Sequence, residues 1–152
     1  MKITAQTAKH LKDVYLGGNW TVINFKDTLK DITWQQAIKK NEPFNTIVTL
    51  VYHCGYFVEV LNKVLEGGPL DGKDAYSFNH PPINSDEDWQ QLLNNFFSNG
   101  EKAVRLIEQL SDEKLSDVFF DEKYGSYYRN INGIIEHLHY HLGQISILKR
   151  II

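Results

Sequence analysis

The stretch "INGIIEHLHYHLGQISILKRII", from Ile131 to Ile152, decides the fold of this chain. At its centre, "HLHYHL" alternates as a β-strand does, and a strand would point His137, His139 and His141 to one side. That alternation is short, whereas the apolar residues keep a helical period through the whole stretch. We therefore predict an α-helix, in which His137 and His141 lie one turn apart while His139 points roughly the other way.

Three further segments have the apolar spacing of a helix. Residues 3–15 form the first, and a pair of glycines at 17 and 18 is expected to end it. Residues 44–66 form the second, which Gly-Gly-Pro at 67–69 stops. The third follows Ser85, because Ser85 and Asp88 resemble a capping box that precedes a helical run to Leu110. The sequence thus predicts an all-α fold, a four-helix bundle with long connections.

The connections are less regular. Residues 19–43 are expected to form a long connection with one or two turns of helix. Residues 70–84 contain Pro81 and Pro82 and are expected to form a surface loop. Residues 111–129 alternate between aromatic and polar side chains, and the pattern leaves loop, short helix and strand equally open.

The composition limits the function. A chain of 152 residues with 42% hydrophobic residues suits a single domain, residues 1–152. Its net charge of −3 offers no basic surplus, so we expect no nucleic-acid partner. We expect no membrane segment and a cytoplasmic location, because no run approaches about 20 apolar residues. The single cysteine, Cys54, is expected to be a buried, inert thiol, so a metal would have to be held by histidine.

On the last predicted helix, His137 and His141 both lie on one shoulder of the apolar stripe centred on Leu138. His53 occupies a similar shoulder of the second predicted helix, and all three could face one groove between packed helices. A histidine pair one turn apart plus one from a facing helix can hold zinc or a similar ion. Spacing alone leaves the alternative open that each ring is merely hydrogen-bonded. The "HLHYH" motif lacks the glutamate of zincin proteases.

Two motifs, "TLVYHCGYF" and "HLHYHLGQI", resemble those of the DinB/YfiT-like superfamily, in particular its DinB-like members. The resemblance extends over most of the chain. It implies an up-down-down-up four-helix bundle in which His53, His137 and His141 hold a divalent metal ion, usually zinc or nickel. Dimers are common among members of the superfamily, so the resemblance leaves both a homodimer and a monomer open. One departure is Leu142, where many relatives carry arginine, so no anion contact is expected from this position.

Two residues beside His141 have alternative interpretations. Gln144 is expected either to hydrogen-bond a ligand histidine and fix its tautomer or to be a plain polar residue on the shoulder. A glycine inside a helix lowers the stability of the helix by about 1 kcal/mol relative to alanine, so the presence of Gly143 needs an explanation. We favour the close approach of another helix over room beside the metal ligand.

Three neutral histidines would leave an ion with at least one open position. The resemblance favours a metal-dependent enzyme of the thiol S-transferase or hydrolase type, acting on a small molecule or a low-molecular-weight thiol. The alternative is a non-catalytic stress-response or small-ligand-binding bundle whose metal site is structural or vestigial. The sequence assigns no catalytic acid or base.

Overall fold

The structure is a computed structural model that describes residues 2–152. Within this range it contains no β-strand, only two isolated bridges, so the expectation of an all-α fold is confirmed. The long helices are α1 (Ile3–Leu16), α4 (Ile47–Leu65), α5 (Asp86–Gln109) and α6 (Tyr127–Ile151). The short elements are α2 (Phe25–Leu29), α3 (Trp34–Ala37) and the 3₁₀ turns η1 (Asp74–Tyr76), η2 (Glu113–Ser116) and η3 (Glu122–Tyr124).

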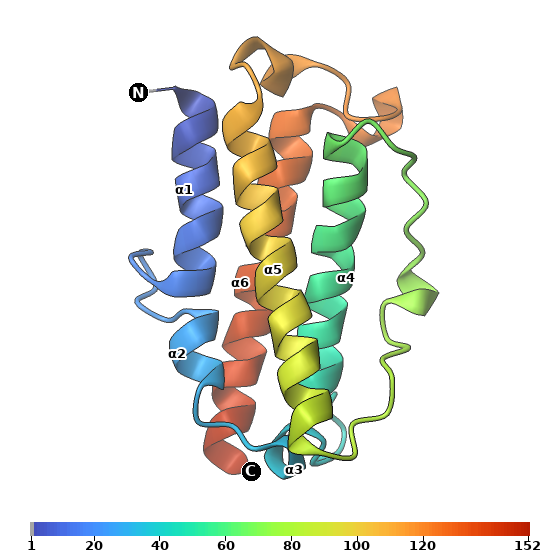
Figure 1. The fold of residues 1–152 in the computed structure, drawn as a ribbon. Helices are drawn as coiled ribbons and strands as arrows, with labels where there is room; N and C mark the ends of the chain where they lie inside the picture. Colours follow the sequence, from blue (N-terminus) through green and yellow to red (C-terminus); the bar gives the residue numbers. More distant parts are fainter. Residues whose placement is uncertain (1) are drawn as a thin grey trace.

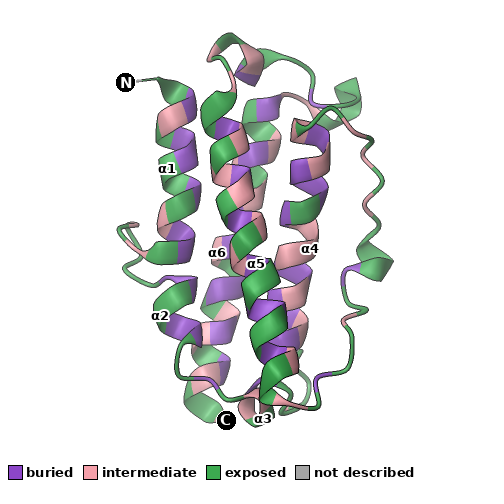
Figure 2. Ribbon diagram, viewed as in Figure 1, coloured by how far each residue is buried: buried purple, intermediate pink, exposed green. Residues whose placement is uncertain are grey.

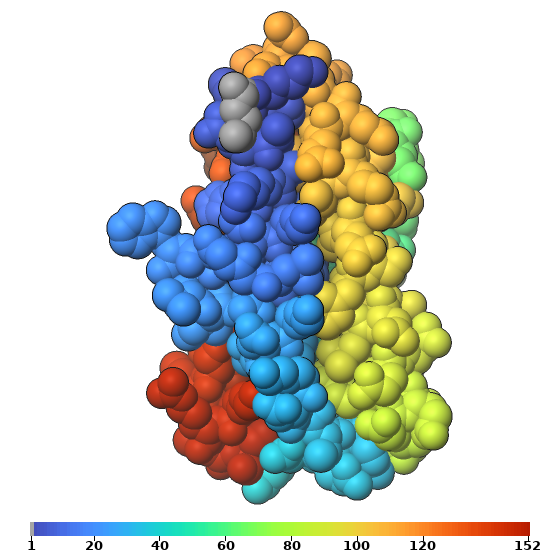
Figure 3. Space-filling model, turned by 60° about the vertical axis from the view of Figure 1, so that its left-hand side comes forward, coloured from blue at the N-terminus to red at the C-terminus, as the bar shows by residue number. Residues whose placement is uncertain are grey.

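The four long helices pack lengthwise against one another (Figure 1). In this view α1 and α6 run downward, while α4 and α5 run upward. The connection between α4 and α5 descends along the outer side of α4 and carries η1. Figure 3 shows α1 beside α5, with the segment that contains α2 and α3 lying between the end of α6 and the start of α5. The first connection therefore covers one end of the bundle.

Side-chain caps explain where the helices begin. Ser85 Oγ accepts a hydrogen bond from the Asp88 amide at 3.1 Å, as the sequence predicts. The Asp88 carboxylate accepts from the Asn84 amide rather than from that of Ser85, so the reciprocal half of the capping box is displaced by one residue. Helix α6 begins at Tyr127, earlier than the periodicity indicates, because Ser126 accepts from the Arg129 amide and caps it.

The apolar stripes of the four helices meet in one core, which Figure 2 shows as the buried inner faces of the ribbons. Trp89 is fully buried, and its indole nitrogen donates to the Ile32 carbonyl at 2.9 Å. Cys54 is also fully buried, and burial raises the pKa of its thiol. The expectation of an inert structural cysteine agrees with both observations. No helix in residues 2–152 has the length and apolar character needed to cross a membrane.

Gly143 differs from expectation. It is exposed on α6, and a Cβ added there would meet no atom within 4 Å. Close packing of another helix of this chain therefore does not explain Gly143, and our preferred interpretation was wrong. Gly100 of α5, by contrast, does have a packing role, since an added Cβ would lie 2.5 Å from the ring of Tyr15 on α1.

Candidate metal centre

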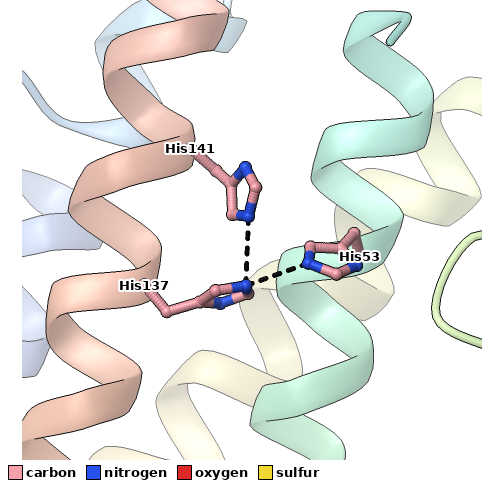
Figure 4. Close-up of side chains that lie close together, drawn as sticks. All are labelled: His53, His137 and His141. Atoms are coloured by element: carbon pink, nitrogen blue, oxygen red, sulfur yellow. Dashed lines mark hydrogen bonds between the residues drawn. The ribbon is translucent and has the colours of Figure 1, made fainter. Parts of the chain in front are cut away.

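Three histidines from two helices converge between α4 and α6 (Figure 4). His53 lies on α4, while His137 and His141 lie one turn apart on α6. The Nε2 atom of His137 is 2.9 Å from that of His53 and 3.0 Å from that of His141. The structure thus brings together the three residues that the sequence singles out.

His139 is not part of this group. Its ring lies 6.1 Å from that of His10, which belongs to α1, on another side of α6. The separation follows from the helical rotation of about 100° per residue, which sends His139 away from its two neighbours in the sequence. A strand would have placed it beside them.

The side chain of Gln144 fixes the tautomer of His141. Its Oε1 atom lies 2.6 Å from His141 Nδ1. An amide oxygen only accepts, so Nδ1 carries the proton and the Nε2 atom of His141 presents a lone pair. His53 Nδ1 has a partner as well, the hydroxyl of Ser77 at 2.8 Å. Gln144 therefore orients His141 as an outer-shell residue orients a metal ligand.

The donor set fits a divalent cation. A neutral imidazole has a single proton on its two nitrogens, so His137 Nε2 cannot donate a full hydrogen bond to both ring nitrogens near it. Convergent imidazole lone pairs suit zinc, nickel, copper and iron. Among residues 2–152, no cysteine or carboxylate joins this group.

Burial keeps the three rings neutral. His53 is 5% exposed and His141 is 8% exposed. Burial, together with the neighbouring rings, lowers the pKa of His137 to about 4, and burial also lowers the pKa values of His53 and His141. A histidine must be deprotonated to bind a metal, so at neutral pH the group is in the state that binding requires.

Phenylalanine rings pack against two of the three histidines. Phe78 stacks on the His53 ring with a centroid separation of 4.4 Å, and Phe57 meets the His137 ring edge-on at 5.2 Å. His137 Nδ1 is buried and has no hydrogen-bond partner in the described part of the chain. The contact with Phe57 therefore helps to orient His137 where a hydrogen bond does not.

Sequence reasoning missed Ser77 and Phe78. They lie in the connection between α4 and α5, which the sequence indicates as a surface loop, yet Ser77 is fully buried. No periodicity or motif marks them. Sequence reasoning also missed Tyr140, whose ring lies 4.9 Å from that of His141. Its position one turn before Gln144 on the same helix was a signal that could have found it.

Comparison with known proteins gives one family and one structural neighbour. The model of the DinB superfamily matches residues 8–145. A conserved protein from Enterococcus faecalis, known from a crystal structure, superposes with a TM-score of 0.72 at 17% identity, over 99% of this chain and 96% of that one. At that identity the likeness concerns the fold alone. The search of curated proteins gave no match.

Proposed function

This chain belongs to the DinB superfamily, and we propose that it is a metal-dependent enzyme whose divalent ion is held by His53, His137 and His141. The observation that carries the proposal is the composition of the histidine group. It offers three neutral nitrogen ligands, with no further histidine, cysteine or carboxylate among residues 2–152. Structural zinc sites are normally filled by four protein ligands, whereas catalytic sites keep a position open.

The reaction we propose on a small-molecule substrate is either an S-transfer, in which a low-molecular-weight thiol is the nucleophile, or a hydrolysis, in which water is the nucleophile; we prefer the thiol. A bound divalent ion would supply positive charge that stabilises a thiolate or hydroxide at neutral pH. Gln144 and Ser77 orient two of the three rings through their Nδ1 atoms. Phe78 and Phe57 pack against the rings of His53 and His137. Zinc and nickel are the ions we expect.

One observation favours the alternative, a non-catalytic bundle whose metal is structural or vestigial. A cavity of about 500 Å³ lies between α4 and α5 and is lined by Tyr52, Tyr56, Gln91 and Asn95 among others. None of the three histidines lines it. A cavity of this size suits a small ligand, so the protein could bind one away from the histidines.

Elemental analysis tests the metal centre. The wild-type chain and its His53→Ala, His137→Ala and His139→Ala variants are purified without a nickel column, because nickel binds nitrogen sites tightly and can replace the cellular ion. We expect the first two variants to lose the metal and His139→Ala to keep it. Retention of the metal by all three variants would contradict the proposal.

A substrate panel separates the two functions. Metal-loaded protein is assayed with thiols and esters, and its thermal stability is measured with and without a chelator. Turnover that disappears with the metal supports the enzyme. Absence of turnover together with a large loss of thermal stability on chelation supports the structural metal. Dimers are common in the superfamily that the chain resembles, so we also propose a homodimer, and sedimentation of the purified chain would test this oligomeric state. The cytoplasmic location expected from the sequence stays a proposal.

A further inference from the structure

Ser77 connects the segment between α4 and α5 to the histidine group. It follows η1 directly and is fully buried, although it belongs to an otherwise largely exposed connection. Its hydroxyl oxygen is 2.8 Å from His53 Nδ1 and 2.6 Å from the carbonyl oxygen of Asp74. A buried serine with two polar contacts of this length is held in one orientation.

These two contacts fix the direction of both hydrogen bonds. The Asp74 carbonyl oxygen only accepts, so the single proton of Ser77 lies on the line to that oxygen. The Ser77 oxygen can then only accept from His53, which makes His53 Nδ1 the donor. His53 Nε2 is left with a lone pair, and it is this atom that faces His137.

Two further contacts dock the same segment on α4. Phe78 stacks on the ring of His53, with an angle of 24° between the planes. The Lys73 amide donates to the Tyr56 hydroxyl at 2.8 Å. The segment 73–78 therefore touches α4 on both sides of Ser77, and two of its contacts are with His53 itself.

We propose that Ser77 is a positioning residue that sets the tautomer of His53 for metal binding and thereby couples metal binding to the docking of segment 73–78. The proposal rests on the metal centre proposed above. Coupling between two equilibria is reciprocal: if docking raises the affinity of the histidines for the metal, the metal stabilises docking by the same factor. Loss of an outer-shell partner of a metal ligand typically lowers metal affinity about 10–100-fold.

The tautomer is measured on metal-free protein at pH 7.5 by long-range ¹⁵N–¹H NMR of the histidine rings. In wild-type protein we expect the His53 proton on Nδ1. In Ser77→Ala, which removes one oxygen atom, we expect a mixture of tautomers at His53 and no change at His141. In the matched control Gln144→Ala, His141 changes and His53 does not.

Metal binding is measured in parallel by competition with a chromophoric chelator, using zinc. We expect Ser77→Ala to bind zinc about 10–100-fold more weakly. Hydrogen exchange at residues 73–78 should slow on addition of zinc in wild-type protein and change much less in Ser77→Ala.

The outcomes separate this proposal from the metal centre. A His53 proton on Nε2 in the wild-type protein overturns the role of Ser77, and this measurement needs no variant. Equal zinc affinity of wild type and Ser77→Ala also overturns it, while the metal centre stands. If no metal binds to wild type, the metal centre and the coupling both fail, whereas the expected tautomers would still show that Ser77 sets the His53 ring.

Discussion

Acidification of the metal-free protein should reduce its free energy of unfolding through the clustered histidines. Burial, together with the neighbouring rings, lowers the pKa of His137 from 6.5 to about 4. In the unfolded chain this ring takes up a proton near pH 6.5, whereas in the folded protein it stays neutral to about pH 4. Its contribution to stability is therefore complete well above pH 6.5 and is lost as the pH falls toward 4.

The expected size follows from the same pKa values. Each unit between the folded and unfolded pKa corresponds to about 1.4 kcal/mol, so His137 alone removes about 2 kcal/mol between pH 7 and pH 5. By pH 4 the loss is about 3 kcal/mol. His53 and His141, whose pKa values burial also lowers, act in the same direction. A protein of this size is stable by about 5–15 kcal/mol, so the loss is large.

Urea unfolding between pH 7 and pH 5, with a chelator present, measures the effect. Hydrogen bonds lower the pKa values of Asp27, Asp112 and Glu113, which moves these carboxyl groups further away from this window, so the window reports mainly the histidines. His137→Gln should show a flatter dependence on pH than wild type. If wild type and His137→Gln lose stability equally over this window, the argument from burial is refuted.

Three further predictions concern stability at neutral pH and below. Gly143→Ala should raise the free energy of unfolding by about 1 kcal/mol in urea titrations, because the site is helical and open. Gly100→Ala should lower the free energy of unfolding, because the added Cβ would clash with Tyr15. Changes of the same sign in the two variants would contradict this prediction. Tyr15→Phe should raise the melting temperature by about 3 °C, since it removes a buried hydroxyl without a partner at a gain of about 1 kcal/mol. Tyr56→Phe should lower the melting temperature, because it removes the hydroxyl that accepts the hydrogen bond from the Lys73 amide. Asp112→Ala should lower the melting temperature at pH 7, because its carboxylate caps α1 and these bonds lower its pKa. The difference in melting temperature between wild type and Asp112→Ala, measured by calorimetry, should shrink below pH 4. A difference that persists there would refute this role of the carboxylate.

Patterns among residues close together in the sequence sufficed to predict most of the helices and of the candidate site. The period of the apolar residues repeats within each helix, so it predicts α1, α4, α5 and α6 without knowledge of their partners. The rotation of a helix likewise separates His139 from His137 and His141. The same rotation places His53 on the shoulder of its own helix, and the resemblance of two short motifs selects the same residue. The structure brings it to 2.9 Å from His137. These inferences depend on residues a few positions apart.

The remaining features depend on segments that are far apart in the chain. Asp112 caps a helix more than 100 residues away, and Ser77 bonds a histidine 24 residues earlier. Gly143 shows the converse, because its sequence suggested a neighbouring helix that the tertiary structure does not supply. Helical period and helical rotation are properties of neighbouring residues, so the sequence sufficed to predict the four long helices and, together with the motif resemblance, the three candidate ligands. Gln144 lies three residues from His141 on the same helix, so it was already a candidate partner. The contact between Ser77 and His53 became visible in the folded chain alone, because a single serine carries no periodic signal and acquires a distant partner when the chain folds.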